Sequence, residues 1–481
     1  MSFEFITPSC GSTLLSLDGM GFPAIRKALA LGREVTLVRV GAMETAASSQ
    51  PVHASLRLCQ GTPSSQKVVI ARALDTVPGA AVQGTLLARA PLALLEGLWI
   101  SAFIVGAAKA IIALETPSDA LAHGIAELDR LGLLTFDVDG SPVELAFEMA
   151  PVQRSFMAGE GTALVEILQG RPPLASTTQL EIKGYGGHPT VVQSAEALVQ
   201  LATWVGGQGL PQTRLFQVLG AVQQEALVEI QPGTSLRSLV FDHCGGMKGA
   251  KPFKFALIGG PTGGFIPAVG LDLLLDPEAM AQAGVAYGSG TIVVGDEGDC
   301  VVDMASRCLA FTAYESCGIC TICREGSFQL KELLSDSTSG RTRPDDDAVL
   351  EEITAALQEG SLCAIGRQLP NPLLTGLRHF GDEFEAHLKK KRCPALVCKQ
   401  YVTFHILGET CTGCGKCLEI CPEGAIEGEV DYIHVIDAGA CTKCGLCYEV
   451  CPPEAAAVVK AGAIKPRTPK APIPVGTWKK R

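Results

Sequence analysis

The chain has 481 residues, of which 47% are hydrophobic and 19% charged, so it is too apolar for a disordered protein. Its length suits roughly two to four domains. A net charge of -11 argues against a nucleic-acid-binding protein, which needs a concentrated basic face. Of the 19 cysteines, four precede residue 301 and fifteen fall between 308 and 451. This clustering excludes a short secreted disulfide scaffold and favours metal or iron–sulfur ligation in a reducing compartment.

The first 205 residues or so alternate short β-rich runs with longer helical stretches. Turn residues separate these segments, and the alternation predicts an α/β core. The expected elements are strands at 35–40 and 67–71, and helices at 91–108, 118–131 and 193–204.

The most apolar stretch of the chain runs from Leu92 to Leu114. Glu96 and Lys109 interrupt it and leave too few uncharged residues to cross a bilayer, which needs about 20. We therefore predict a buried helix that runs into a strand. The N-terminus lacks the basic and apolar regions of a signal peptide. We expect a cytoplasmic protein without a membrane span.

The rest of the chain does not continue the alternation of strands and helices found in the first 205 residues. Residues 210–265 are β-rich, whereas 300–390 show helical spacing, most clearly at 349–357 and 373–387. The polar segment 335–347 predicts a solvated loop between helices. The last 21 residues contain four prolines and six basic residues. They predict an extended arm, either a disordered tail or a strap on a partner.

An internal duplication carries the strongest metal signal. The pattern Cys-x2-Cys-x2-Cys-x3-Cys-Pro begins at Cys411 and recurs 30 residues later at Cys441. In two-cluster ferredoxins, three cysteines of such a run hold one cluster and the fourth ligates the other. We therefore predict one [4Fe–4S] cluster on Cys411, Cys414, Cys417 and Cys451, and a second on Cys421, Cys441, Cys444 and Cys447. Zinc sites usually have two-plus-two spacing instead, and the segment resembles a two-cluster bacterial ferredoxin.

A third cluster is predicted upstream. Cys317, Cys320 and Cys323 have the same two-residue spacing, and Cys363 follows forty residues beyond. Three closely spaced cysteines and one remote cysteine suit another [4Fe–4S] cluster.

Around this motif the sequence resembles the flavoprotein subunit of respiratory complex I and its soluble relatives. These relatives include diaphorase subunits of multimeric and electron-bifurcating hydrogenases, formate dehydrogenases and class II benzoyl-CoA reductase. The stretches 362–374 and 378–387, and the appended ferredoxin, are similar to the hydrogenase branch. The diglycine run Gly259–Gly264 is not a phosphate loop, because no helix start or lysine follows it.

The resemblance covers essentially the whole chain and implies its domain organisation. The implied domains are a degenerate FMN/NADH-binding-like α/β domain at 1–206, a β-grasp (soluble-ligand-binding) insert and connection at 207–298, a helical iron–sulfur domain with a hinge at 299–402, a two-[4Fe–4S] ferredoxin domain at 403–460 and an extended tail at 461–481.

The glycine-rich loop that wraps the FMN phosphate in the family departs from its pattern here. In the family this loop has the form G-R-G-G-A-G-F-P-T-G-x-K. Here it reads Leu17–Lys27, in which Phe22, Pro23 and Lys27 persist. Asp18 and Ile25 stand where the family has glycine. We expect Asp18 to repel a phosphate and the side chain of Ile25 to block close approach of the backbone.

Four further segments of the family's flavin and nicotinamide pocket are also altered. The matching residues are Arg72–Asp75 for N-A-D-E, Ala113–Thr116 for R-G-E-Y, Gly159–Leu164 for G-E-E-T-A-L and Gln193–Ala197 for the asparagine-rich N-N-V-E-T. Lys27, Gly159 and Glu160 remain as a residual FMN-type pocket. Because so many changes fall in one pocket, we expect FMN and NAD binding to be lost.

A fourth metal site is predicted on Cys300, His387, Cys393 and Cys398. Cys300 stands where hydrogenase-type relatives also carry cysteine, and the other three lie between Cys363 and the ferredoxin. Three cysteines and one histidine suit a closed structural zinc site that would fix the hinge. The alternative is free loop cysteines, with His387 facing solvent. The remaining cysteines follow no ligand pattern, and we expect them to be buried as small apolar side chains: Cys10, Cys59, Cys244 and Cys308.

These features predict an iron–sulfur electron-transfer subunit of a cytoplasmic multi-subunit oxidoreductase complex, with three [4Fe–4S] clusters, one zinc ion and no FMN. The resemblance implies redox partners: a thioredoxin-like [2Fe–2S] subunit, a catalytic dehydrogenase, hydrogenase or reductase subunit, or a flavin-bearing subunit. Two alternatives stay open. One is an active NAD(P)H:FMN oxidoreductase (diaphorase) subunit, and the other is a scaffold whose N-terminal domain only docks neighbours.

Overall fold

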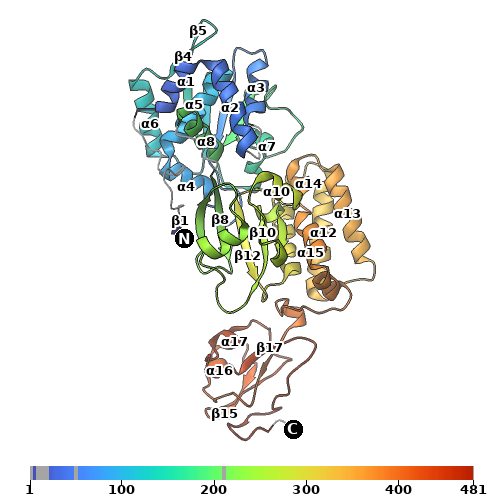
Figure 1. Cartoon of the computed structure of the whole chain (residues 1–481). Helices are drawn as coiled ribbons and strands as arrows, with labels where there is room; N and C mark the ends of the chain where they lie inside the picture. The colour runs from blue at the N-terminus through green and yellow to red at the C-terminus, as the bar shows by residue number, and fades with distance from the viewer. Residues whose placement is uncertain (1–3, 7–20, 48–51, 208–212, 480–481) are drawn as a thin grey trace. The chain divides into compact units, whose positions relative to one another are not determined.

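The computed structural model of the chain describes residues 4–6, 21–47, 52–207 and 213–479. The chain forms two compact units. The first comprises Met1–Asp296, Cys308–Phe328 and Thr354–Thr375, and the second comprises Glu297–Arg307, Gln329–Ile353 and Gly376–Arg481. Figure 1 shows the elements along the chain.

A four-stranded parallel sheet lies at the centre of the N-terminal part of the first unit. Its strand order is β6-β3-β2-β7, with β2 at Val68–Arg72, β3 at Lys109–Leu114, β6 at Ala146–Pro151 and β7 at Thr190–Ser194. Alternate residues of the strands enter two different apolar clusters, such as Val69 in one and Val68 in the other. Both faces are therefore covered, as is usual for parallel sheets.

The other elements of this part are α1 (Pro23–Leu31), α2 (Arg33–Ala47), α3 (Val52–Gly61), α4 (Val82–Arg89), α5 (Pro91–Val105), α6 (Asp119–Arg130), α7 (Gly161–Leu168), α8 (Ala195–Gly206) and the hairpin of β4 (Thr135–Val138) and β5 (Ser141–Glu144). The predicted strand at 67–71 and the predicted helices near 91, 118 and 193 are confirmed. Helix α8 begins only at Ala195 because Gln193 and Ser194 end strand β7, and the Ser194 hydroxyl caps the helix.

The apolar stretch from Leu92 to Leu114 forms the buried helix and following strand that its sequence predicted. Nearly every residue of α5 is buried, and β3 follows three residues after its end. Helices α5 and α8 pack closely at Gly97, where a Cβ atom would lie 2.0 Å from the Leu198 carbonyl oxygen. In the described residues no single helix is long and apolar enough to cross a membrane, although α4 and α5, bent by 99°, pass that test as a pair.

The strand predicted at 35–40 is wrong, because these residues belong to helix α2. Leu37 and Val40 are buried, whereas Val35 and Val38 are 53% and 71% exposed. This spacing is helical. The indole Nε1 of Trp204, on α8, donates to the Arg39 carbonyl at 2.6 Å. Packing against α8 thus overrides the β preference of the valines.

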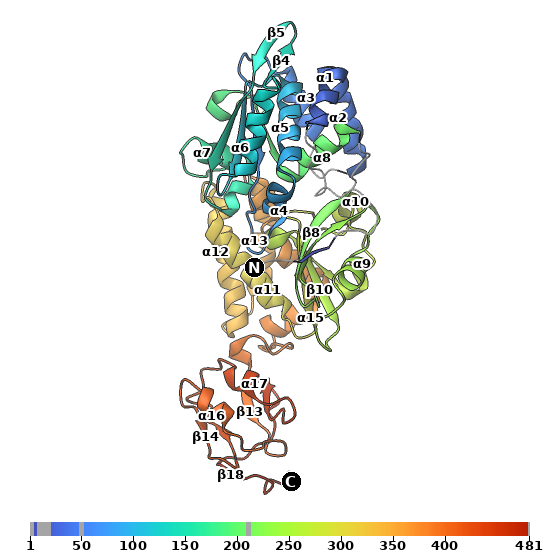
Figure 2. The ribbon, with the colours of Figure 1, turned by 90° about the vertical axis from the view of Figure 1, so that its left-hand side faces the viewer.

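The β-rich middle of the chain forms a mixed sheet of six strands (Figure 2). Its order is β1-β9-β8-β12-β10-β11, with β1 at Glu4–Ile6, β8 at Arg214–Gly220, β9 at Ala226–Ile230, β10 at Phe253–Ile258, β11 at Gly264–Pro267 and β12 at Thr291–Asp296. Short helices α9 (Leu236–Ser238) and α10 (Pro277–Gln282) accompany it. The diglycine run Gly259–Gly264 forms a 3-10 turn between β10 and β11, so it opens no α-helix.

The following segment is helical, as predicted. It contains α11 (Val301–Glu315), α12 (Thr321–Ser339), α13 (Asp346–Gly360), α14 (Ala364–Gln368) and α15 (Asn371–Leu388). The solvated loop predicted at 335–347 is wrong in part, because α12 continues to Ser339 and Ser337 is fully buried. Thr342 is also buried, and its hydroxyl donates to the Leu388 carbonyl at 2.9 Å.

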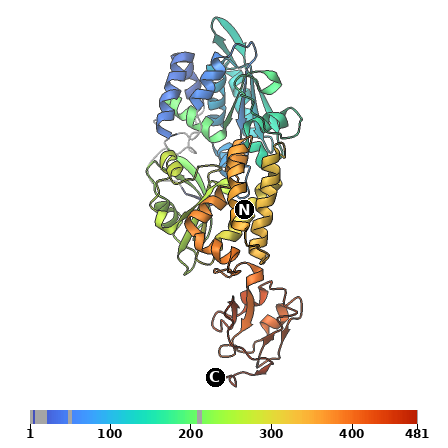
Figure 3. The same cartoon turned by 90° about the vertical axis from the view of Figure 1, so that its right-hand side faces the viewer.

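The C-terminal part of the second unit has a ferredoxin-like arrangement of short elements. These are β13 (Thr403–Ile406), α16 (Lys416–Ile420), β14 (Ile426–Glu427), β15 (Tyr432–Ile433), β16 (Val435–Ile436), α17 (Leu446–Val450), β17 (Val458–Ala461) and β18 (Ile473–Pro474). The described part of the predicted C-terminal arm, up to residue 479, contacts the ferredoxin-like part of the same chain. There β18 pairs with β15, and Trp478 packs against Gly408. Figure 3 shows this C-terminal part of the chain, in red, from another side.

Candidate metal centres

Four cysteines gather at the Cys317 site, which we define as Cys317, Cys320, Cys323 and Cys363. Burial raises the pKa of the Cys323 thiol to about 11, and the other three cysteines add to this rise because they lie close to it. The Ser316 hydroxyl lies 3.6 Å from the Cys323 sulfur and opposes the rise. A set of four crowded thiols suits iron, whose binding would displace their protons.

Cys363, the remote cysteine of this site, immediately precedes α14. Burial raises the pKa of Cys363, while the backbone N–H groups of Gly366 and Ile365 donate to its sulfur and oppose the rise. The Arg367 guanidinium donates to the Ser361 carbonyl at 3.1 Å and thereby holds the preceding loop. Cys317 and Cys363 pack against the apolar cluster of Met157, Ala163 and Ala175.

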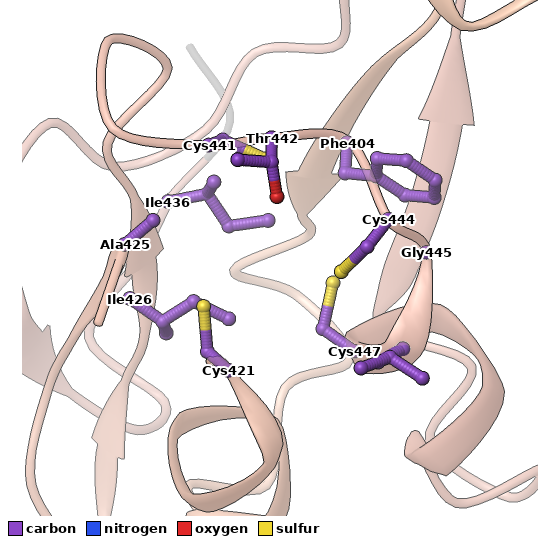
Figure 4. A pocket seen from close by; sticks show the side chains of 11 residues that line it. Phe404, Cys421, Ala425, Ile426, Ile436, Cys441, Thr442, Cys444, Gly445 and Cys447 are labelled. Carbon is purple, nitrogen blue, oxygen red and sulfur yellow. The ribbon is translucent and has the colours of Figure 1, made fainter. Parts of the chain in front are cut away.

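The ferredoxin-like part contains two similar hollows. One, the Cys411 site, is lined by Cys411, Cys414, Cys417 and Cys451. The other, the Cys441 site, is lined by Cys421, Cys441, Cys444 and Cys447. These are the two crossed sets that the spacing predicted, each with one cysteine from the other repeat. Figure 4 shows the four side chains of the Cys441 site arranged around their hollow.

His434 lines the Cys411 site and was missed by the sequence reasoning. It lies between β15 and β16 and is 1% exposed. Burial lowers its pKa, and its ring Nε2 is a buried atom without a hydrogen-bond partner in the part of the chain described. The sequence signal that could have found it is its position one full repeat after Phe404, which lines the Cys441 site.

Cys300, His387, Cys393 and Cys398 also come together, at the Cys300 site. All four are buried, and one ligand atom of each lies within 4.8 Å of the others. The sulfurs of Cys300 and Cys398 each lie 3.4 Å from His387 Nε2. His387 does not face solvent.

The histidine of this site is oriented by a second contact. His387 Nδ1 lies 2.7 Å from the Glu383 carbonyl, which leaves Nε2 directed at the cysteines. A backbone carbonyl on the other ring nitrogen is the usual support of a metal-bound histidine. Burial lowers the pKa of His387, but hydrogen bonds to Cys300 and Cys393 outweigh this and raise it to about 10. The donor set fits a tetrahedral zinc ion.

The residues predicted to remain of an FMN-type pocket, Lys27, Gly159 and Glu160, make hydrogen bonds within the protein. Glu160 caps α7, because its carboxylate accepts hydrogen bonds from the Ala163 N–H at 2.7 Å and the Thr162 hydroxyl at 2.6 Å. The Lys27 ammonium donates to the Gly206 carbonyl, at the end of α8, at 3.4 Å. The Gly159 carbonyl accepts a hydrogen bond from Arg72.

Of Asp18 and Ile25, at which the glycine-rich loop departs from the family, the structure describes Ile25 alone. Asp18 lies outside the described residues. The Ile25 side chain is fully buried in the apolar core. The N–H groups of Ala24 and Ile25 donate to Glu96 Oε1, at 2.8 and 3.3 Å.

A polar hollow lies beside the ends of strands β2 and β7. Arg72, Glu196, Arg214 and Tyr287 are among its lining residues. The Glu196 carboxylate accepts hydrogen bonds from the Tyr287 hydroxyl at 2.8 Å and the Leu215 N–H at 3.2 Å. Arg72, which lines this hollow, also donates a hydrogen bond to the Gly159 carbonyl.

The cysteines without a ligand pattern are buried, as predicted. Cys59 and Cys244 are fully buried and Cys308 is 7% exposed, whereas Cys10 lies outside the described residues. Burial raises the pKa of each of the three described thiols to about 12.

Comparisons with known proteins match two iron–sulfur regions of the chain. Residues 303–387 match the NADH-ubiquinone oxidoreductase-F iron-sulfur binding region, and residues 403–452 match the 4Fe-4S dicluster domain. The HndC component of the NADP-reducing hydrogenase of Solidesulfovibrio fructosivorans is 32% identical over 88% of this chain and 90% of that protein. The second F-type component of the NADH-quinone oxidoreductase of Rhizobium meliloti (strain 1021) is 30% identical over 68% and 82%.

The chain belongs to the F-type family of NADH-quinone oxidoreductase subunits. Within this family it is an iron–sulfur, electron-transfer subunit of the oxidoreductase type, with 4Fe-4S-binding regions. Its fold also resembles the crystal structure of an NAD+-reducing [NiFe]-hydrogenase in the H2-reduced state. The TM-score is 0.69 at 26% identity, over 81% of this chain and 69% of the other.

Proposed function

We propose that this F-type chain relays electrons between partner subunits through three [4Fe–4S] clusters and carries no flavin of its own. The observation that carries the proposal is the grouping of twelve cysteines into three sets of four, at the Cys317, Cys411 and Cys441 sites. Each set supplies the four thiolates that a cubane cluster needs.

The chain's own residues would hold each cluster, and the clusters would supply one-electron transfer when bound. Apolar side chains surround the ferredoxin-like sites, such as Ile406 and Val458 at one and Ile426 and Ile436 at the other. They would exclude water from the iron, which protects a cluster and influences its potential. Electrons would pass between the Cys317 site and the ferredoxin pair, with redox subunits as donor and acceptor.

The absence of flavin is supported by the altered N-terminal pocket. Arg72 fills space beside Gly159 with a long cationic side chain at a position where the family has asparagine. The surviving residues Lys27 and Glu160 are engaged in contacts within the protein. These residues do not fit the FMN site of the family, so we derive no hydride step for this chain.

We also propose that the Cys300 site holds a structural zinc ion and that the domains follow the sequence-based bounds. In this proposal the zinc fixes the hinge before the ferredoxin domain at 403–460, and residues 207–298 form the β-grasp insert with its connection. The proposal is supported by the convergence of three buried sulfurs and one oriented imidazole.

A second function, that of an FMN-dependent diaphorase, is favoured by one observation. The polar hollow lies at the carboxyl ends of parallel strands, which is where α/β sheets bind ligands. Glu160 lies close enough to Cys363 for its charge to raise the pKa of that thiol. A flavin there would therefore be near the Cys317 site.

Flavin analysis separates the two functions. The full chain is purified without air, and acid-released flavin is measured per chain, together with the cluster absorbance before and after addition of NADH. We expect no stoichiometric flavin and no bleaching by NADH, whereas dithionite should bleach the clusters. About one FMN per chain, with bleaching by NADH, would reverse the proposal and make the chain a diaphorase.

A further inference from the structure

The two ferredoxin-like sites differ at one pair of buried residues. The internal duplication has a period of 30 residues, so Phe404 and His434 occupy equivalent positions in the two repeats. Phe404 lines the Cys441 site, and His434 lines the Cys411 site. One hollow therefore receives an apolar ring where the other receives an imidazole.

The other residues that line the two hollows differ less in their ability to interact with a bound cluster. Ile406 and Ile436 are equivalent, as are Thr412 and Thr442. Lys416 in one repeat corresponds to Leu446 in the other, but Lys416 is exposed, so water and salt screen its charge. His434 is the buried polar difference.

The imidazole of His434 is fixed in place but incompletely bonded. It is 1% exposed, and its Nε2 has no partner among the described residues. Gly428 lies directly against the ring, since a Cβ atom there would be 2.6 Å from His434 Cδ2. Leaving a buried polar nitrogen without a partner destabilises a protein, and such atoms point to a missing ligand.

A cluster sulfur would be that ligand. Four cysteines line the same hollow as His434, and a cubane bound by them would present sulfide and thiolate sulfurs to the ring. We propose that His434 donates a hydrogen bond from Nε2–H to a sulfur of the cluster at the Cys411 site. The bond makes this cluster the more readily reduced of the ferredoxin pair. This inference rests on the proposed occupancy of the two sites by [4Fe–4S] clusters.

The direction of the change in reduction potential follows from the charge of the cluster. One-electron reduction makes the cluster more negative, so its sulfurs accept a hydrogen bond more strongly in the reduced state. The bond therefore stabilises the reduced form and raises the potential. The Cys441 site has the Phe404 ring at the equivalent position, which cannot donate such a bond. The electron on a half-reduced ferredoxin domain then resides mainly at the Cys411 site.

The test measures cluster potentials in the full chain, purified without air, by redox titration followed by electron paramagnetic resonance. All variants are made in a chain that carries Cys320→Ser, which is designed to remove the cluster at the Cys317 site and leave the ferredoxin pair. His434→Phe should lower the potential of one cluster and leave the other unchanged. His434→Gln, which keeps an N–H donor, should restore part of the shift. Phe404→His should raise the potential of the second cluster.

A matched control and a direct signature complete the test. His405→Phe alters a histidine of the neighbouring strand β13 that bonds to Thr403, and it should leave both potentials unchanged. Protein labelled with 15N-histidine should show nitrogen coupling to one reduced cluster, and His434→Phe should abolish it. Unshifted potentials or absent coupling, with both clusters present by iron analysis, would overturn the inference alone. A protein that cannot hold the two clusters would overturn the proposed function with it.

Discussion

Glu96 is a buried carboxyl group that holds the start of α1 from inside the protein. It is 6% exposed and accepts the N–H groups of Ala24 and Ile25. Burial raises its pKa from 4.5 to about 7, and the two hydrogen bonds only partly oppose the rise. The folded chain therefore keeps the Glu96 proton over a pH range in which the unfolded chain has released it.

We predict that Glu96 makes the protein less stable as the pH rises. Between about pH 4.5 and 7 the folded state binds more protons at this residue than the unfolded state, so the free energy of unfolding falls with pH and then levels off. The total effect is up to about 3 kcal/mol. Glu96→Gln, whose carbonyl can still accept both N–H groups, should flatten this dependence in urea unfolding measured from about pH 5.5 to 7.5. Glu127→Gln, at an exposed site of α6, is the control. The prediction would be contradicted if the free energy of unfolding of Glu96→Gln fell with pH as steeply as that of the parent.

A second prediction at this scale concerns the Cys317 site. Cys320→Ser should remove roughly a third of the iron, because one of three four-cysteine sets loses a ligand. The ferredoxin pair should keep its signal in electron paramagnetic resonance. Cys308→Ala, a change on the same α11–α12 segment at a cysteine without a ligand pattern, should leave the iron content unchanged. Iron loss spread over all three clusters would show that the ligand sets are assigned wrongly.

At the scale of elements, the segment between α15 and β13 is held by side chains more than by regular structure. It contains only a short 3-10 turn at Lys399–Tyr401. The Cys300 site ties this segment to the start of α11, and the Tyr401 hydroxyl donates to the Ser337 carbonyl at 2.6 Å. The stability of the segment should therefore depend on the metal.

We predict that Cys398→Ser loosens this segment. The variant should lose its zinc and become sensitive to trypsin at the basic run 389–392, because three remaining ligands hold the metal weakly. The cluster absorbance should be unchanged. Cys244→Ser, at a buried cysteine of the β-rich part, serves as the matched control. Equal rates of trypsin cleavage in Cys398→Ser and the parent would argue against a zinc-held hinge.

At the scale of the whole molecule, the four sites predict a metal stoichiometry. The fully loaded chain should contain about twelve iron atoms, four for each cluster, and about one zinc ion. Elemental analysis of protein purified without air measures both. Eight iron atoms per chain would mean that the protein holds two clusters and not three. Fully loaded protein without zinc would mean that the Cys300 site is a group of free thiols with a histidine.

The sequence by itself predicted which cysteines lie together and indicated the family. Cysteine spacing in the ferredoxin repeats predicted the two crossed sets that line separate hollows, because the ligands of such clusters lie within short loops. Helical spacing likewise predicted α13 and α15, since an amphipathic pattern is a local property.

Only the tertiary structure decided features that depend on distant residues. Residues 35–40 are helical because they pack on α8, the Ile25 side chain turns into the core, and the C-terminal arm pairs with β15. The role of His434 depends on the fold, which places it at the Cys411 site with its Nε2 unpartnered among the described residues. A sequence pattern records local geometry, whereas the direction of a side chain and the partner of a strand are set by packing between segments far apart in the chain.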